Sequence, residues 1–192
     1  SAGPEKVIPR LEKAVIRELN DLGFAQSHFA VTLESNAPTA GSSVPVSMTG
    51  FDSIEFQFAP NPGEPSRSLR AIASSGEMAR VMLALKTVLA AEDQVPILIF
   101  DEVDANVGGE TANVVGEKMR KIGENRQTLC ITHLAPVAAA ADAHYVVSKR
   151  VEEGRTFSDI ALLDAAGRVG ELARMLGGKG DAAKKHAQEL LK

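Results

Sequence analysis

Hydrophobic residues recur at helical spacing near the start of the chain. Leu11, Val15 and Leu22 are separated by charged residues, and Gly23 follows them as a stop signal. This spacing predicts a helix over residues 9–22. Such a helix is either an ordinary amphipathic helix or the last turns of a longer coiled coil, and the pattern leaves both alternatives open.

The hydrophobic period shortens to two residues further along the chain. Two sets of aromatic and aliphatic residues alternate with smaller or polar ones: Phe29, Val31 and Leu33, and then Ile54, Phe56 and Phe58. The alternation predicts two half-buried antiparallel strands joined by a loop rich in Pro, Gly and Ser. A turn-rich connection over residues 61–65 follows, because two prolines and a glycine do not fit inside a strand ladder.

A helical period returns after the second strand. Its apolar positions follow the spacing of a buried face: Met78, Val81, Met82, Leu85, Val88 and Leu89. Ser74 or Ser75 is the predicted N-cap. Backbone N–H groups at a helix start beside a hydroxyl belong either to a simple capped helix or to a phosphate site, and both interpretations stay open here.

Two apolar runs end in polar residues. The first, residues 97–100, follows a proline and ends in Asp101 and Glu102, which predicts a fully buried parallel strand. The second run, residues 128–132, ends in His133. Because ligands bind at the carboxyl ends of strands in open α/β sheets, these three residues are predicted to share a site. The alternatives are two solvated acids opening a loop and a structural histidine.

The remaining segments predict a helix, a hairpin and two terminal helices. Gly108 and Gly109 precede a helix with apolar residues on one face: Ala112, Val115, Met119 and Ile122. Strands around residues 146–148 and 160–163 are predicted to form a hairpin that turns at Glu153 and Gly154. Residues 168–176 and 179–191 are predicted helices, separated by two glycines.

Composition limits the classes of protein to consider. The chain has 192 residues, 44% of them hydrophobic, and a net charge of −4, which predicts a globular core rather than a surface covered in phosphate-binding groups. Cys130 is the single cysteine, so no internal disulfide can form, and a reducing compartment is expected. No membrane span is predicted. A basic set on the third predicted helix and beyond it is either a nucleic-acid patch or a solvated face: Lys118, Arg120, Lys121 and Arg126.

Four ordered motifs carry a resemblance to a known family. They are Ala-Ser-Ser-Gly-Glu at residues 73–77, Ile-Leu-Ile-Phe-Asp-Glu-Val-Asp at 97–104, Gly-Gly-Glu-Thr-Ala at 108–112 and Thr-His-Leu-Ala-Pro-Val-Ala at 132–138. From about Leu69 to Met175 the chain resembles the C-terminal half of the ATPase head of the RecN family. These proteins are DNA-repair relatives of the structural-maintenance-of-chromosomes (SMC) proteins, within the ATP-binding-cassette (ABC) superfamily.

The resemblance implies roles for individual residues. Ser74, Ser75, Gly76 and Glu77 would form the signature motif that reaches across a dimer to the ATP of the other head. Ser75 departs from the family, which usually has glycine there. In the nucleotide site itself, Asp101 would hold the magnesium shell, Glu102 would orient the hydrolytic water, Asp104 would lie on the loop that couples two nucleotide sites, and His133 would contact the γ-phosphate.

The resemblance also implies an architecture. The expected fold class is α/β, the C-terminal lobe of an ABC/SMC-type head with a mostly parallel sheet core, flanking helices and antiparallel strands. Its expected parts are the end of a returning coiled-coil helix or a leading helix (1–23), a strand-rich flank (24–66), and a lobe with the signature, Walker B acids and switch histidine (67–192).

One motif of the complete head does not occur in the chain. Residues 177–180, Gly-Gly-Lys-Gly, lack both the spacing and the hydroxyl of a Gly-x-x-x-x-Gly-Lys-Ser/Thr phosphate loop. The N-terminal lobe of the same head is expected to supply that loop, and the chain alone is expected to be inactive.

The implied function is hydrolysis of ATP with Mg²⁺ when two heads of a homodimer engage, in DNA double-strand-break repair and recombination. DNA would be a partner, and the location would be the cytoplasm, on the nucleoid. Two alternatives stay open: another SMC-type chromosome-organising head, and a non-catalytic dimerisation or DNA-scaffolding module.

Overall fold

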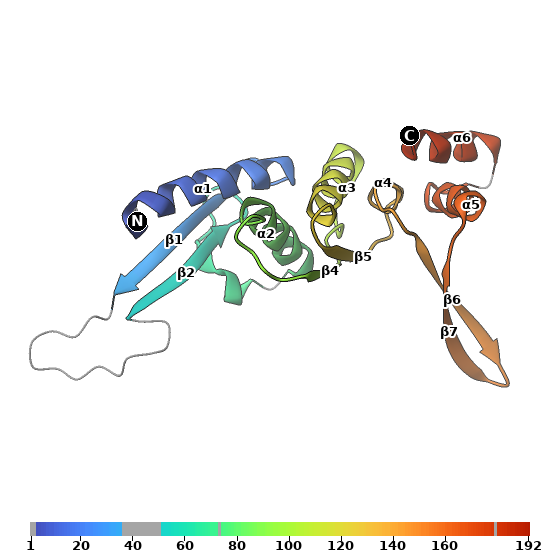
Figure 1. The fold of residues 1–192 in the computed structure, drawn as a ribbon, viewed down its shortest axis with the longest axis horizontal. Helices are drawn as coiled ribbons and strands as arrows, with labels where there is room; N and C mark the ends of the chain where they lie inside the picture. The colour runs from blue at the N-terminus through green and yellow to red at the C-terminus, as the bar shows by residue number, and fades with distance from the viewer. Residues whose placement is uncertain (1–2, 36–50, 73, 179) are drawn as a thin grey trace, which may run out of the picture. The chain divides into compact units, whose positions relative to one another are not determined.

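The computed structural model describes residues 3–35, 51–72, 74–178 and 180–192 (Figure 1). Contacts within the chain divide it into two compact units, residues 1–93 and 94–192, and each unit is described by itself. The predicted loop between the first two strands lies largely outside the described residues, as do Ala73 and Lys179. The division into residues 1–23, 24–66 and 67–192 stays a prediction.

Helix α1 (Pro4–Asp21) opens the first unit. It confirms the predicted helix but begins five residues earlier, because a proline fits the first turn of a helix, where its missing N–H has no intrahelical acceptor. Leu22 is its C-cap, and Gly23 follows with a φ of 91°, a conformation that glycine adopts readily. Val15, Leu19 and Leu22 form its buried face.

The predicted antiparallel strands are β1 (His28–Ser35) and β2 (Asp52–Ala59), and the short β3 (Arg67–Ser68) pairs with β2. Phe29 lies opposite Phe58 in this ladder, and both rings are buried. Glu12 on α1 accepts a hydrogen bond from the backbone N–H of Val31 at 2.8 Å. This bond holds α1 against the edge of β1 that does not pair with β2.

A 3₁₀ turn, η1 (Leu69–Ala71), leads into helix α2 (Ser75–Val88). The buried face of α2 differs from the predicted one, because Met82 is exposed whereas Leu83 and Ala84 are fully buried. Helix α2 packs on α1. Arg80 joins this core, with its guanidinium 5.0 Å from the centre of the Phe24 ring.

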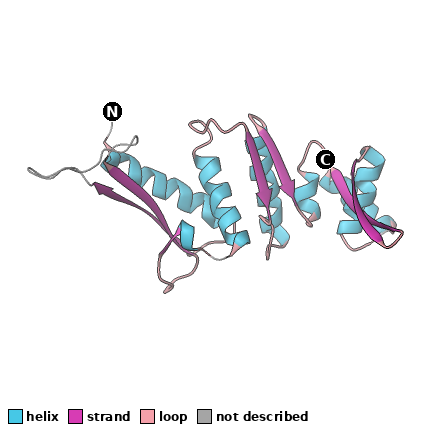
Figure 2. Cartoon of the chain, turned by 90° about the horizontal axis from the view of Figure 1, so that it is seen from below, coloured by secondary structure: helices cyan, strands magenta, loops and turns pink. Residues whose placement is uncertain are grey.

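The second unit begins with the parallel pair β4 (Ile97–Asp101) and β5 (Gln127–Ile131). Helix α3 (Gly109–Gly123) connects the two strands and covers one face of the pair (Figure 2). Leu98 and Phe100 are buried in β4, and Val115 and Met119 are buried on α3. This arrangement is the strand–helix–strand unit of an α/β fold.

The prediction that β4 is fully buried is wrong for this chain. Ile97 and Ile99 are 54% and 69% exposed, and Leu129 and Ile131 of β5 are also exposed. Successive side chains of a strand point to opposite faces, so these four lie on the face away from α3. Within the described part of this unit, no element covers that face.

The rest of the second unit confirms the predicted hairpin and the two terminal helices, and it adds a short helix that was not predicted. Helix α4 (Ala135–Ala139) precedes β6 (Tyr145–Glu152) and β7 (Arg155–Leu162), which turn through Glu153 and Gly154 with positive φ angles of 50° and 77°. Helices α5 (Ala165–Met175) and α6 (Asp181–Leu190) pack on α4 around a small core. Arg168 of α5 donates hydrogen bonds to carbonyl oxygens at the end of α4, including that of Ala139 at 2.9 Å.

Two helical glycines give a matched test of packing between α3 and α4. A Cβ atom at Gly116 would lie 3.0 Å from the Cβ of Ala140 and 3.1 Å from the carbonyl oxygen of Pro136, whereas one at Gly170 of α5 would meet no atom within 4 Å. Gly116→Ala should therefore lower the free energy of unfolding by about 1–2 kcal/mol through overpacking. Gly170→Ala should raise it by about 0.5–1 kcal/mol through helix propensity. Urea unfolding of both variants tests the packing, and equal stabilisation by the two substitutions would contradict it.

Candidate active site

Residues from two adjacent strands meet at one edge of the β4–β5 pair. Asp101 and Glu102 lie at the carboxyl end of β4, and His133 follows the end of β5. The strands are parallel, and Asp101 lies opposite Ile131. The two acids and the histidine therefore lie at the same edge of the sheet, with all three residues exposed. The sequence predicted this placement, and the catalytic roles of the three residues stay predictions.

The backbone turns sharply at Glu102. Its φ angle is 57°, in the left-handed region that residues other than glycine rarely adopt, and Asn106 has a similar angle. The Glu102 carbonyl accepts a hydrogen bond from the N–H of Ala105 at 3.0 Å, which closes a tight turn. Such strain costs about 1 kcal/mol or more and is often found at functional sites. The turn therefore ends strand β4 at Asp101. No feature of the sequence pattern predicted this turn.

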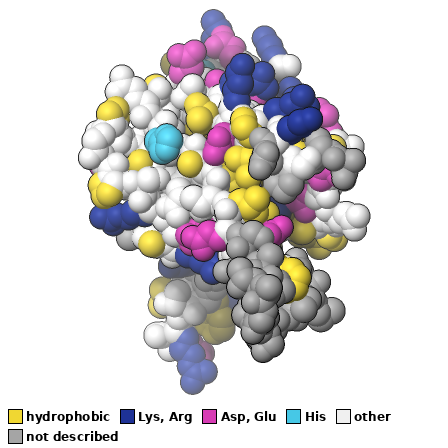
Figure 3. Space-filling model, turned by 90° about the vertical axis from the view of Figure 1, so that its left-hand side faces the viewer, with side chains coloured by type: hydrophobic (Ala, Val, Ile, Leu, Met, Phe, Trp, Pro, Cys, Tyr) yellow, Lys and Arg dark blue, Asp and Glu magenta, His cyan; other side chains and the backbone are white. Residues whose placement is uncertain are grey.

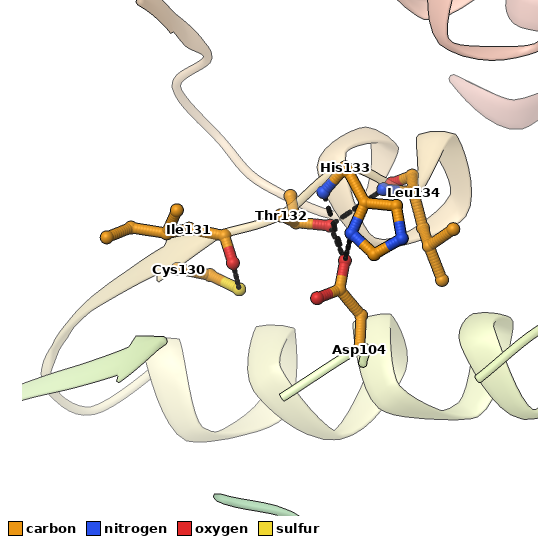
Figure 4. A network of polar contacts seen from close by, with 6 residues as sticks. All are labelled: Asp104, Cys130, Ile131, Thr132, His133 and Leu134. Carbon is orange, nitrogen blue, oxygen red and sulfur yellow. Dashed lines mark hydrogen bonds and ion pairs between the residues drawn. The ribbon is translucent and has the colours of Figure 1, made fainter. Parts of the chain in front are cut away.

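Asp104, the third acid after β4, points into the protein. Its residue surface is only 2% exposed, and its Oδ2 atom accepts hydrogen bonds from the Thr132 hydroxyl at 2.5 Å and from the His133 backbone N–H at 3.1 Å (Figure 4). The Nδ1 atom of His133 lies 3.3 Å from the same oxygen. The turn after β4 is thus tied to the end of β5. Thr132 was not among the predicted site residues, although its place directly before His133 at a strand end could have indicated it.

Cys130 of β5 reports the electrostatics of this edge. Burial raises the pKa of its thiol to about 12, with smaller contributions from the negative charges of Asp104 and Asp101. The group stays a neutral thiol at physiological pH, although Cys130 is only partly buried.

The predicted signature residues lie in the first unit, at the start of α2. Ser74 is the N-cap, and its Oγ atom accepts a hydrogen bond from the N–H of Glu77 at 3.4 Å. Of the two predicted caps, Ser74 is therefore correct. Gly76 is buried, whereas Ser75 is exposed. The positive end of the helix dipole lies at this segment, which favours negative charge nearby.

The donor set fits a magnesium ion shared with phosphate groups. Among the described residues there is no group of three or more His, Cys, Asp or Glu side chains that could hold a metal ion. Mg²⁺ in nucleotide sites is usually bound through one or two carboxylates together with substrate phosphates and water. Asp101, an exposed carboxylate at a strand end, is a donor of this kind, and its role as a metal ligand stays a prediction.

The surface drawn in Figure 3 carries both acidic and basic side chains. On the face drawn in Figure 3, acidic and basic side chains lie interspersed. Of the basic residues at α3 and after it, Arg120 and Lys121 are exposed in the last turn of the helix, where cations stabilise the helix dipole. Lys118 and Arg126 are partly buried. In the part of the chain that the structure describes, no helix is long and apolar enough to span a bilayer.

Solved structures with a similar fold include SMC head domains. The Smc head domain with a coiled coil and joint from Pyrococcus yayanosii matches with a TM-score of 0.53 and 19% identity, over 95% of this chain and 29% of that chain. The Smc head domain of Pyrococcus furiosus with an extended coiled coil, bound to the C-terminal domain of ScpA, matches with a TM-score of 0.51, over 95% of this chain and 38% of that one. At this level of identity the likeness establishes the fold, and the predicted α/β fold class is confirmed.

Sequence comparison gives closer relatives. No family model matches the chain. The DNA repair protein RecN of Treponema pallidum is 51% identical over 145 residues, which cover 74% of this chain and 25% of the relative. RecN of Xylella fastidiosa is 44% identical over 88% of this chain and 29% of its own length, and RecN of Deinococcus radiodurans is 40% identical over 99% and 32%.

These relatives match 74–99% of this chain at 40–51% identity, while the chain spans about a quarter to a third of their length. The family inferred from the four motifs is confirmed. The chain belongs to the RecN family of DNA repair proteins.

Proposed function

We propose that this chain is the C-terminal lobe of a RecN-type ATPase head, which hydrolyses ATP when two heads engage during repair of DNA double-strand breaks. The observation that carries the proposal is the shared edge of β4 and β5, where Asp101, Glu102 and His133 lie together. A carboxylate for the metal, a second carboxylate for the water and a histidine near the phosphate are the groups that this chemistry needs.

Each residue has a distinct part in the proposed reaction. Asp101 binds the magnesium ion, which neutralises charge on the phosphates. Glu102 orients the attacking water and accepts its proton, and it lies in the turn that directly follows β4. His133 contacts the γ-phosphate. The segment Ser74–Glu77 supports the same chemistry from the second head, because the start of α2 favours an anion.

The exposed face of the β4–β5 pair supports an N-terminal lobe as the partner within the head. Ile97, Ile99, Leu129 and Ile131 lie together on that face. Burying an aliphatic side chain fully contributes about 1.5–3 kcal/mol, so covering this face would stabilise an association of lobes by several kcal/mol. A lobe that carries the phosphate loop is the occupant we propose, since the chain has no such loop.

DNA and cellular location enter the proposal through the family. The relatives are DNA repair proteins, and we propose that the complete protein acts on DNA on the nucleoid, in the cytoplasm. Arg120 and Lys121 have a structural explanation in the helix dipole, and Lys118 and Arg126 are partly buried, so no DNA-binding surface is assigned to this set. A non-catalytic scaffolding module and another SMC-type head are less well supported, because the acids and the histidine are present and the sequence relatives are RecN proteins.

The chain alone should not bind ATP stoichiometrically or hydrolyse it. A phosphate loop supplies the backbone donors and the lysine that hold the β- and γ-phosphates, and this chain contains none. Titration calorimetry with ATP and Mg²⁺ should show no stoichiometric binding until a lobe with the phosphate loop is added. Stoichiometric binding by the chain alone would refute the proposed division of the site between two lobes.

A further inference from the structure

The strongest unassigned feature of the second unit is the bonding of Asp104. A buried carboxylate is costly unless several donors compensate for its lost hydration. Here a single oxygen, Oδ2, receives the Thr132 hydroxyl and the His133 backbone N–H, and it lies 3.3 Å from the His133 Nδ1 atom. The Thr132 oxygen in turn accepts the N–H of Leu134 at 3.0 Å, which extends the network into the residue that caps α4.

We propose that Asp104 is a positioning residue that fixes the ring orientation and the tautomer of His133. The Oδ2 atom of Asp104 accepts the hydrogen bond of the His133 backbone N–H and also contacts Nδ1 of the His133 ring. One oxygen atom therefore holds both the backbone and the ring of the histidine. The Nε2 atom lies on the other side of the ring, and the His133 side chain is 71% exposed (Figure 4). The reactive edge of the ring is therefore presented outward, at the edge of the sheet that carries Asp101 and Glu102.

The contact has a defined chemical consequence for the ring. A carboxylate next to Nδ1 favours the tautomer that carries its proton on Nδ1, and the neutral ring then exposes a lone pair on Nε2. Carboxylates orient histidines in this way in metal sites and in catalytic triads. That Nε2 then meets a γ-phosphate rests on the proposed function, whereas the orientation of the ring does not.

This assignment gives Asp104 a different role from the one implied by the resemblance. A carboxylate that is 2% exposed and holds three groups of its own chain acts on the nucleotide through His133 rather than by touching it. A purely structural anchor would also explain the burial. The tautomer of His133 separates the two, because an anchor of the backbone alone has no influence on the ring.

Nitrogen NMR spectra of the 192-residue chain test the tautomer directly, at a pH where the imidazole rings are neutral. His28 and His186, both exposed, serve as internal references. We expect His133 to be mainly the Nδ1–H form and to change to mainly Nε2–H in Asp104→Ala. Thr132→Val removes the other side-chain donor to Asp104 and should leave the ring of His133 in its Nδ1–H form.

Asp104→Asn provides a variant with the same shape if Asp104→Ala does not fold. It keeps an acceptor oxygen but loses the charge, so the Nδ1–H fraction of His133 should fall measurably. A wild-type His133 that is mainly Nε2–H, as free imidazole side chains are, would overturn the proposal. So would an Nδ1–H fraction that is unchanged in every folded Asp104 variant.

Kinetics of a head reconstituted with the phosphate-loop lobe separate this inference from the proposed function. Asp104→Asn should lower kcat about tenfold or more, with the KM for ATP changed by less than about threefold, since the histidine is misplaced while binding groups remain. Unchanged kcat together with an unchanged Nδ1–H fraction of His133 would overturn the positioning role. An unmodified head without any ATPase activity would instead refute the proposed function, and the NMR result would still decide the role of Asp104.

Discussion

Glu102→Gln should lower ATP turnover of the reconstituted head by roughly two to four orders of magnitude while ATP binding persists. Glutamine keeps the size of the side chain but cannot accept a proton from the attacking water. Asp101 still holds the metal, so engaged dimers should accumulate in the presence of ATP. Single-turnover kinetics and size-exclusion chromatography measure the two effects.

Asp101→Asn should behave differently, because an amide is a poorer ligand for Mg²⁺ than a carboxylate. Here the magnesium-dependent part of ATP binding should weaken, and engaged dimers should not accumulate. Glu189→Gln removes an exposed acid of α6 and serves as the control, with normal turnover expected. The same loss of binding in the Asp101 and Glu102 variants, with no trapped dimer in either, would show that the division of roles is wrong.

The periodicity of hydrophobic residues predicted most elements of this fold, because each element buries one face within its own unit. The alternation of Phe29 and Val31 gave β1, and the pairing of Phe29 with Phe58 follows from the same burial. The run at residues 97–100 gave β4 correctly as a parallel strand but suggested burial on both faces. One sequence does not reveal which faces are covered within the chain and which stay exposed.

The sequence predicted which residues form the candidate site, but only part of their arrangement in space. The ends of two parallel strands predicted that Asp101 and His133 would lie at one edge, since register follows from pairing. The positive φ of Glu102 and the inward direction of Asp104 are tertiary features with no periodic signal. The choice between Ser74 and Ser75 as the N-cap also needed coordinates, because both residues have a suitable hydroxyl.

Ser74→Arg should abolish turnover of the reconstituted head and leave ATP binding to that head intact. If the signature acts in trans, an arginine side chain at the start of α2 puts bulk where the helix must approach the phosphate of the opposite head. Ser74 is also the N-cap of α2, so its loss costs about 1 kcal/mol of stability in any variant. Ser74→Ala loses the same cap without the bulk and is the matched control, and it should retain far more activity than Ser74→Arg.

Mixing two inactive heads tests whether each nucleotide site combines residues of two heads. A Ser74→Arg head keeps a working phosphate loop, and a head with a disabled loop keeps a working signature, so their heterodimer has one intact composite site. The ATPase rate of the mixture should rise well above that of either mutant alone. Hydrolysis by Ser74→Arg alone at the unmodified rate, with the usual dependence on head concentration, would contradict the account.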